Sequence, residues 1–147
     1  MKSFQDSKSR IWILDITVST LRRVKALTDL DIGNISTLTD GTLSDKIGSD
    51  PVMLADLLYA IVKPDAERLQ ISQEDFCDSI SGDVIEAASF TLLEALADFF
   101  PSQQGALIRK LLELAKKQQE KAAQESEKLL DQMTSGLQST PTPESQE

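Results

Sequence analysis

Residues 50–64 read DPVMLADLLYAIVKP, and this stretch decides the fold because its apolar side chains fall on nearly every face of a helix. Asp50 is a favoured helix-capping residue, and Pro51 suits the first helical position, where its missing N–H is not needed. Pro64 is expected to end or kink the helix. A helix that is apolar all round has to be covered on several sides. The stretch therefore predicts a buried central helix with other elements packed around it.

The segment before this helix predicts a short β-hairpin followed by another helix. RIWILDIT is rich in β-branched residues and places Trp12, Leu14 and Ile16 on one side, which favours a hairpin over about residues 3–16. Thr17 can then cap a helix. The apolar residues of that helix are Val18, Leu21, Val24 and Leu27, and its basic residues, Arg22, Arg23 and Lys25, are expected to face water.

Polar and proline-containing stretches divide the rest of the chain. Residues 28–49 are rich in Asp, Ser, Thr and Gly and predict irregular chain or a short helical turn. Ser72 is expected to cap a short helix. Asp83 opens a long amphipathic helix that Pro101 stops, and Ser102 caps a last helix.

These segments together predict a mainly α fold. Forty per cent of the residues are apolar and only 5% are aromatic, so Leu, Ile, Val and Ala do most of the packing, as suits helices lying on helices. We expect a compact helical domain of about four to five helices in residues 1–117, including the short N-terminal hairpin. An extended helical or disordered tail is expected in residues 118–147.

The predicted tail includes KKQQEKAAQESEK, which has strong helix formers and almost nothing to bury. Leu129, Leu130 and Met133 then form a small apolar patch before SGLQSTPTPESQE, whose composition is typical of a disordered tail. Two interpretations of residues 116–137 are equally open. The segment is either a frayed, solvated tail or a docking element that orders when a partner covers its apolar patch.

Charge, cysteine usage and hydropathy limit the classes of partner. Residues 1–28 carry a formal charge of +4, whereas residues 29–100 carry fifteen acidic and three basic residues, for a charge of −12. A field of that sign repels phosphate backbones, so we expect no nucleic-acid binding; a solvated helical surface explains the charge equally well. The single cysteine, Cys77, agrees with a reducing compartment. No apolar run approaches the roughly 20 residues that span a bilayer, so no membrane association is expected.

The sequence lacks most of the groups that make or break bonds. It contains no histidine, the commonest general base and metal ligand, and one cysteine cannot build a thiolate zinc site. Cys77 beside Phe76 on an amphipathic segment is interpreted as a core thiol. No glycine-rich phosphate loop is present. We therefore predict no enzymatic activity, no catalytic residue, no cofactor and no metal site.

Two acidic groups of residues are candidate sites. Residues 29–40 resemble a calcium-binding loop, but Gly33 occupies the fifth position, Asn34 the sixth, and the short Asp40 the twelfth. A solvated polar loop is the favoured interpretation. Four carboxylates could supply pairs for acid–base chemistry: Glu67, Glu74, Asp75 and Asp78. Carboxylates at helix starts are ordinary, however, because they offset the helix dipole, and this structural interpretation is favoured.

The order of motifs resembles a known family. The motifs are ITVSTLRRVK, DPVMLADLLYAI, the helix start at Gly82-Asp83, and ADFFP at residues 97–101. Over residues 4–117 they resemble the small tail assembly chaperones of long-tailed (siphovirus-like) bacteriophages and prophages. The resemblance implies a non-enzymatic protein of the host cytoplasm that binds the tape measure protein, helps recruit tail tube subunits, and is absent from the mature virion. It also implies a longer frameshifted form, for which the codons of Lys116-Lys117 are a candidate position.

Shielding an aggregation-prone apolar helix requires an apolar binding surface. We expect a groove between residues 83–100 and 102–115, lined by Phe100, Leu107 and Leu111. The second predicted interaction surface is the apolar patch of Leu129, Leu130 and Met133. The sequence also permits a homo-oligomer. Two other functions stay open: a structural or adaptor component of a phage particle, and an acidic inhibitor that binds a host factor.

Overall fold

The computed structural model describes the backbone of residues 2–139 and the side chains of residues 2–135. The chain divides into two compact units, Met1–Leu112 (unit 1) and Glu113–Glu147 (unit 2). The sequence predicts the end of the folded domain slightly later, at residue 117, within the same helix. Of the predicted disordered tail, which begins at Ser135, residues 135–139 are helical and belong to the last helix, and residues 140–147 lie outside the described residues.

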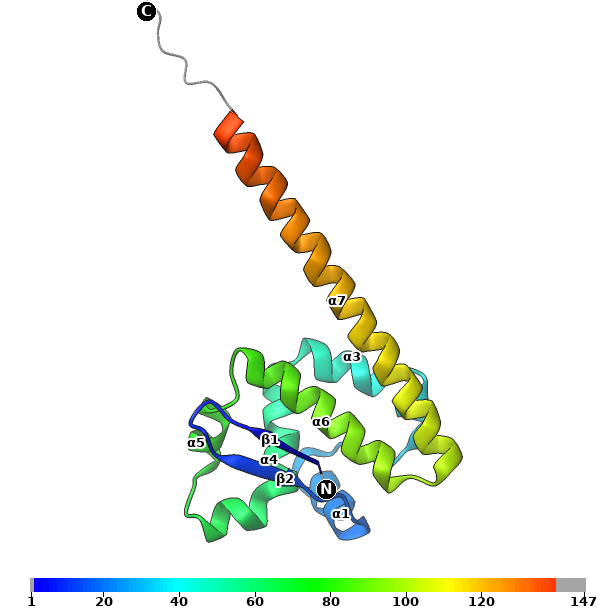
Figure 1. The fold of residues 1–147 in the computed structure, drawn as a ribbon. Helices are drawn as coiled ribbons and strands as arrows, with labels where there is room; N and C mark the ends of the chain where they lie inside the picture. The colour runs from blue at the N-terminus through cyan, green and yellow to red at the C-terminus, as the bar shows by residue number, and fades with distance from the viewer. Residues whose placement is uncertain (1, 140–147) are drawn as a thin grey trace, which may run out of the picture. The chain divides into compact units, whose positions relative to one another are not determined.

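The described residues form a two-stranded antiparallel hairpin and seven helices, which confirms the mainly α fold (Figure 1). In chain order the elements are β1 (Lys2–Gln5), β2 (Ile11–Leu14), α1 (Val18–Thr28), α2 (Ile35–Thr39), α3 (Thr42–Ser49), α4 (Pro51–Arg68), α5 (Gln73–Asp78), α6 (Asp83–Phe99) and α7 (Ser102–Ser139).

The number of helices exceeds the expected four to five because the polar stretch of residues 28–49 folds into two short ones. Asn34 caps α2 by accepting a hydrogen bond from the Ser36 N–H at 3.0 Å. The isolated apolar residues of this stretch pack into the core and stabilise the two helices, which the polar composition of the stretch did not indicate. Leu38, Leu43 and Ile47 are each at most 5% exposed and join the core.

Helix α4 is the buried centre of unit 1, as its sequence predicts. Asp50 accepts a hydrogen bond from the Met53 N–H at 3.1 Å, and Pro51 occupies the first turn. Helices α1, α3, α5 and α6 and strand β2 all pack against α4. Its buried residues are Leu54, Ala55, Leu57, Leu58, Ala60, Ile61, Val62 and Ala66.

Pro64 is expected from the sequence to end or kink α4. It does not end the helix, which continues to Arg68. A proline has no N–H, so the Ala60 carbonyl four residues earlier loses its partner within the helix. Arg23 of α1 supplies the replacement: its Nε donates to the Ala60 oxygen and its Nη2 to the Ile61 oxygen, both at 2.7 Å. The predicted solvent-facing position of Arg23 is therefore wrong, whereas Arg22 is exposed as expected.

We expect Arg23→Met to lower the free energy of unfolding by about 2 kcal/mol, since it removes two charge-assisted hydrogen bonds to the carbonyls of the buried residues Ala60 and Ile61. In a Pro64→Ala background, residue 64 regains an N–H for the Ala60 oxygen, so the same Arg23 change should cost about 1 kcal/mol less. Urea unfolding of the four proteins, followed by circular dichroism, measures the difference. An equal loss in both backgrounds would contradict the proposed pairing of Arg23 with Pro64.

The predicted hairpin is confirmed, and it covers one side of the helical core. Phe4 pairs with Trp12 across the two strands, and Phe4, Trp12 and Leu14 are buried. β1 and β2 lie against α6, and β2 also contacts α4 (Figure 1). The alternate residues Ile11 and Ile13 face outward and are exposed.

The first turns of α7 belong to unit 1 and lie very close to α6. Gly105, Ile108 and Leu112 are the buried positions of these turns. A Cβ atom on Gly105 would overlap the backbone oxygen of Ala97, so only glycine permits this approach. Pro101 separates the two helices, as the sequence predicts.

Gly105→Ala should therefore destabilise the fold although alanine is the better helix former. Overpacking against a backbone atom costs about 1–3 kcal/mol, which exceeds the roughly 1 kcal/mol gained from helix propensity. The matched control is Gly48→Ala in α3, where a Cβ meets nothing within 4 Å, and it should stabilise the protein. Thermal unfolding of both variants should move the midpoint in opposite directions; two shifts of the same sign would refute the close packing.

Candidate functional site

The structure places the predicted interaction residues of unit 1 in two different environments. Leu107 and Leu111 lie one turn apart on α7 and are 53% and 39% exposed. Phe100 is half-buried, packs against the core, and makes an edge-to-face contact with Phe99 at a ring distance of 5.3 Å. Leu107 and Leu111 are thus available to a partner, whereas Phe100 contributes mainly to packing at the end of α6.

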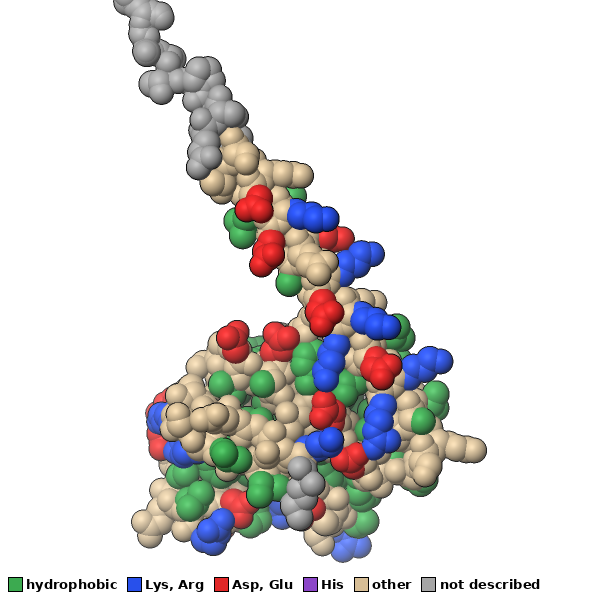
Figure 2. All heavy atoms as spheres, viewed as in Figure 1, with side chains coloured by type: hydrophobic (Ala, Val, Ile, Leu, Met, Phe, Trp, Pro, Cys, Tyr) green, Lys and Arg blue, Asp and Glu red, His purple; other side chains and the backbone are tan. Residues whose placement is uncertain are grey.

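The predicted patch of unit 2 lies on a helix that is almost entirely exposed. Leu129, Leu130 and Met133 are 59–64% exposed. They fall within about one turn of α7, since Leu130 and Met133 follow Leu129 by one and four residues. We call these three residues the C-terminal apolar patch. Figure 2 shows that acidic and basic side chains alternate along this part of α7. Within residues 113–135, only Ala115 is half-buried.

An open cavity of about 590 Å³ lies elsewhere in unit 1, between α1, α4 and the start of α5. Leu27 and Leu30 contribute from the end of α1 and the loop after it, and Val52, Met53 and Tyr59 contribute from α4. We call this the α1–α4 groove. The sequence does not reveal this groove, because Leu27 has the helical spacing of a core residue although its side chain is 50% exposed.

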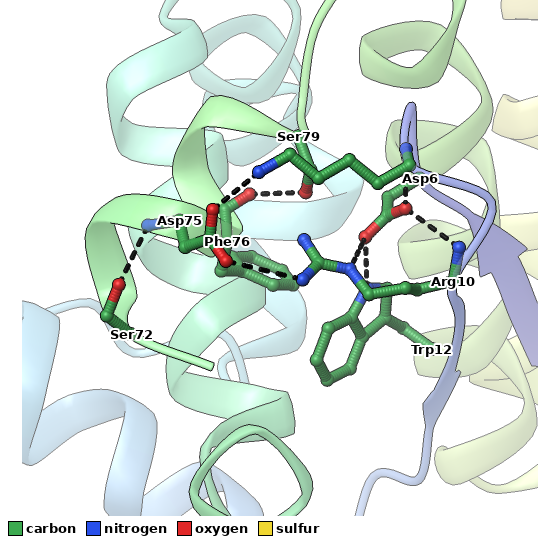
Figure 3. Close-up of polar contacts among 8 residues, drawn as sticks. Asp6, Arg10, Trp12, Ser72, Asp75, Phe76 and Ser79 are labelled. Carbon is green, nitrogen blue, oxygen red and sulfur yellow. Dashed lines mark hydrogen bonds and ion pairs between the residues drawn. The ribbon is translucent and has the colours of Figure 1, made fainter. Parts of the chain in front are cut away.

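A second feature that the sequence did not reveal is the buried carboxylate of Asp6 in the hairpin loop (Figure 3). One oxygen accepts hydrogen bonds from the backbone N–H groups of Lys8 and Arg10, both at 2.9 Å. The other accepts from Arg10 Nε and Trp12 Nε1, both at 2.8 Å. The available signal was an Asp in a predicted turn with an Arg four residues later.

Contacts with α5 extend this cluster and fasten the hairpin loop to the helical core (Figure 3). Lys8 Nζ lies 2.5 Å from an Asp75 oxygen, Arg10 Nη1 lies 3.6 Å from the other, and the Ser7 N–H donates to the Ser79 oxygen at 3.0 Å. Beneath them, the rings of Trp12 and Phe76 meet edge to face at 5.0 Å. The cluster connects two segments that are distant in the chain.

The electrostatics of this cluster favour a structural role. Burial alone would raise the pKa of Asp6, but the hydrogen bonds from Trp12, Arg10 and Lys8 together outweigh it and hold that pKa below its usual range. The hydrogen bond and charge of Lys8 likewise lower the pKa of Asp75. A carboxylate that is held ionised and accepts four hydrogen bonds is poorly suited to take up a proton as a general base.

The remaining candidates for chemistry have similar structural explanations. Cys77 is half-buried, and burial, followed by the charges of Asp56 and Asp78, raises the pKa of its thiol, which disfavours the nucleophilic thiolate. In the stretch that resembles a calcium loop, Asp40 accepts a hydrogen bond from the Thr42 N–H at 2.8 Å at the start of α3. Among the described residues, no group of three or more Cys, Asp or Glu side chains is arranged to hold a metal ion.

No protein-family model, no curated protein and no solved structure matches this chain. Among the described helices, none is long and apolar enough to cross a membrane. Among the exposed apolar side chains of the described residues, three groups are candidate functional features: the Leu107 and Leu111 pair, the C-terminal apolar patch and the α1–α4 groove.

We expect Asp6→Asn to lower the free energy of unfolding by about 2 kcal/mol at pH 7, because it leaves Arg10 without its buried counter-charge. The folded-state pKa of Asp6 is lowered, so its contribution is complete above the unfolded pKa of about 3.9 and is lost as the pH falls through the folded value. The stability gap between wild type and variant should thus shrink at acid pH. Asp131→Asn on exposed α7 is the control; a gap that does not change with pH would contradict the ionised Asp6.

Proposed function

We propose that this protein is a non-enzymatic tail assembly chaperone that binds the tape measure protein of a long-tailed phage and helps recruit tail tube subunits. The observation that carries the proposal is the C-terminal apolar patch, whose three large side chains stay about 60% exposed on an otherwise polar stretch of α7. Such a surface favours a docking element over a purely solvated tail, because apolar side chains gain free energy only when a partner covers them.

Two further properties support a binding role. The folded unit buries its own core and still leaves apolar side chains exposed on α7, namely Leu107 and Leu111. The formal charge of −9 makes copies of the protein repel one another. This repulsion opposes aggregation of the protein and of a complex that it forms. A tape measure protein exposes long apolar helices before tube subunits surround it. These helices aggregate unless a soluble protein binds them.

Co-expression of the full chain with a tape measure fragment tests the proposal. We expect the fragment to move from the insoluble to the soluble fraction and to co-purify with the chain. Replacing all three residues of the C-terminal apolar patch with Ser should reduce this rescue several-fold. The matched control replaces Gln118, Gln119 and Ala122, which have the same spacing on the same helix, and should leave the rescue unchanged.

No rescue by the wild-type chain would overturn the proposal, and equal rescue by both triple variants would remove the patch from it. Mass spectrometry of purified virions separates the chaperone from a structural or adaptor component, since a chaperone is absent from the finished particle. Stoichiometric amounts of the chain in virions would favour the structural alternative.

A further inference from the structure

The α1–α4 groove combines exposed apolar side chains from two helices. Leu27 at the end of α1 is 50% exposed and Val52 in the first turn of α4 is 70% exposed. Between them, Leu30, Met53 and Tyr59 are half-buried and pack against the core. Large apolar residues therefore form both the floor and the rim of this surface.

Two of the three charged residues that line the groove are acidic. Asp50 and Asp56 line it, and within the described residues neither carboxylate lies within ion-pair distance of a cation. Asp56 accepts only a long hydrogen bond, from Gln73 Nε2 at 3.4 Å. The one basic residue of the lining, Lys63, lies 3.6 Å from Glu67 on the next turn of α4, so its charge is already compensated.

We propose that the α1–α4 groove binds an amphipathic helix of another protein, whose apolar stripe is flanked by lysine or arginine residues. Apolar side chains at helical spacing would cover Leu27 and Val52, and the flanking cations would approach Asp50 and Asp56. The partner's identity as the tape measure protein rests on the proposed function, whereas the chemistry of the bound helix does not.

The shape of the groove favours a helix over a small molecule. A volume of about 590 Å³ accommodates several apolar side chains, but sites for small ligands enclose most of the ligand surface. Here the cavity is open, and its exposed rim residues would stay in water around a small ligand. A helix lying along the space between α1 and α4 covers floor and rim together, as a third helix does when it packs on a pair.

Two synthetic peptides test the charge requirement. They share a helical leucine stripe at i, i+3, i+4 and i+7, and one carries lysine beside the stripe where the other carries glutamate. Calorimetric titration into the full chain at low salt should show the lysine peptide binding at least about tenfold more tightly, with the preference shrinking as salt rises. Asp56→Asn should reduce the preference. Equal affinities, or no binding of the lysine peptide, would overturn the proposal.

A pair of double variants tests the location. Leu27→Ser with Val52→Ser removes the exposed apolar side chains of the groove and should weaken the lysine peptide at least about tenfold. Ile11→Ser with Ile13→Ser is the matched control, since these residues are similarly exposed, at 68% and 45%, on the hairpin. Circular dichroism is the check that both variants fold. Equal weakening in the two variants would place the binding site elsewhere.

The outcomes separate this inference from the proposed function. If the groove variant still solubilises the tape measure fragment as wild type does, the groove is not the site and the chaperone function stands. If wild type fails to solubilise the fragment but binds the lysine peptide through the groove, the groove stands and the function fails. A wild-type dimer that the groove variant abolishes would place a second copy there and overturn the proposed occupant.

Discussion

The burial of α4 is the constraint on which the rest of unit 1 depends. Its apolar side chains point in nearly all directions, so the helix is stable only when most of its surface is covered. The hairpin and helices α1, α3, α5 and α6 meet this requirement from different parts of the chain.

Packing other elements around α4 buries polar groups that apolar side chains cannot pair. Two arginines, Arg23 and Arg10, supply partners for these groups. Pro64 leaves the Ala60 carbonyl without a helical partner in a buried setting, and the guanidinium of Arg23 restores it. The hairpin loop lies beside the aromatic contact of Trp12 with Phe76. There Arg10 forms ion pairs with Asp6 of the loop and Asp75 of α5. These contacts fix the orientation of α1 and the hairpin more specifically than the apolar contacts beneath them.

The sequence predicted what local signals determine. The cap at Asp50, the stop at Pro101 and the alternation around Trp12 each act within a few residues, and each is found in the structure. It left open whether the helix ends at Pro64 or continues through it, because the compensating Arg23 is about forty residues away in the chain. It likewise could not identify the α1–α4 groove, because helical spacing is the same for a core residue and for an exposed one such as Leu27.

The size of the exposed surfaces indicates what kind of binding they can support. Fully burying a large apolar side chain contributes roughly 1.5–3 kcal/mol, and the three side chains of the C-terminal apolar patch are already partly covered. Association itself costs about 4–15 kcal/mol, so the patch alone gives at most weak, reversible binding. Stable capture therefore requires a second contact on the same chain or several copies along one partner, since linked weak contacts multiply in affinity. The chaperone function that we propose requires binding to a long helix and later release from it. Several weak surfaces suit that function, because each can be displaced in turn as tube subunits bind.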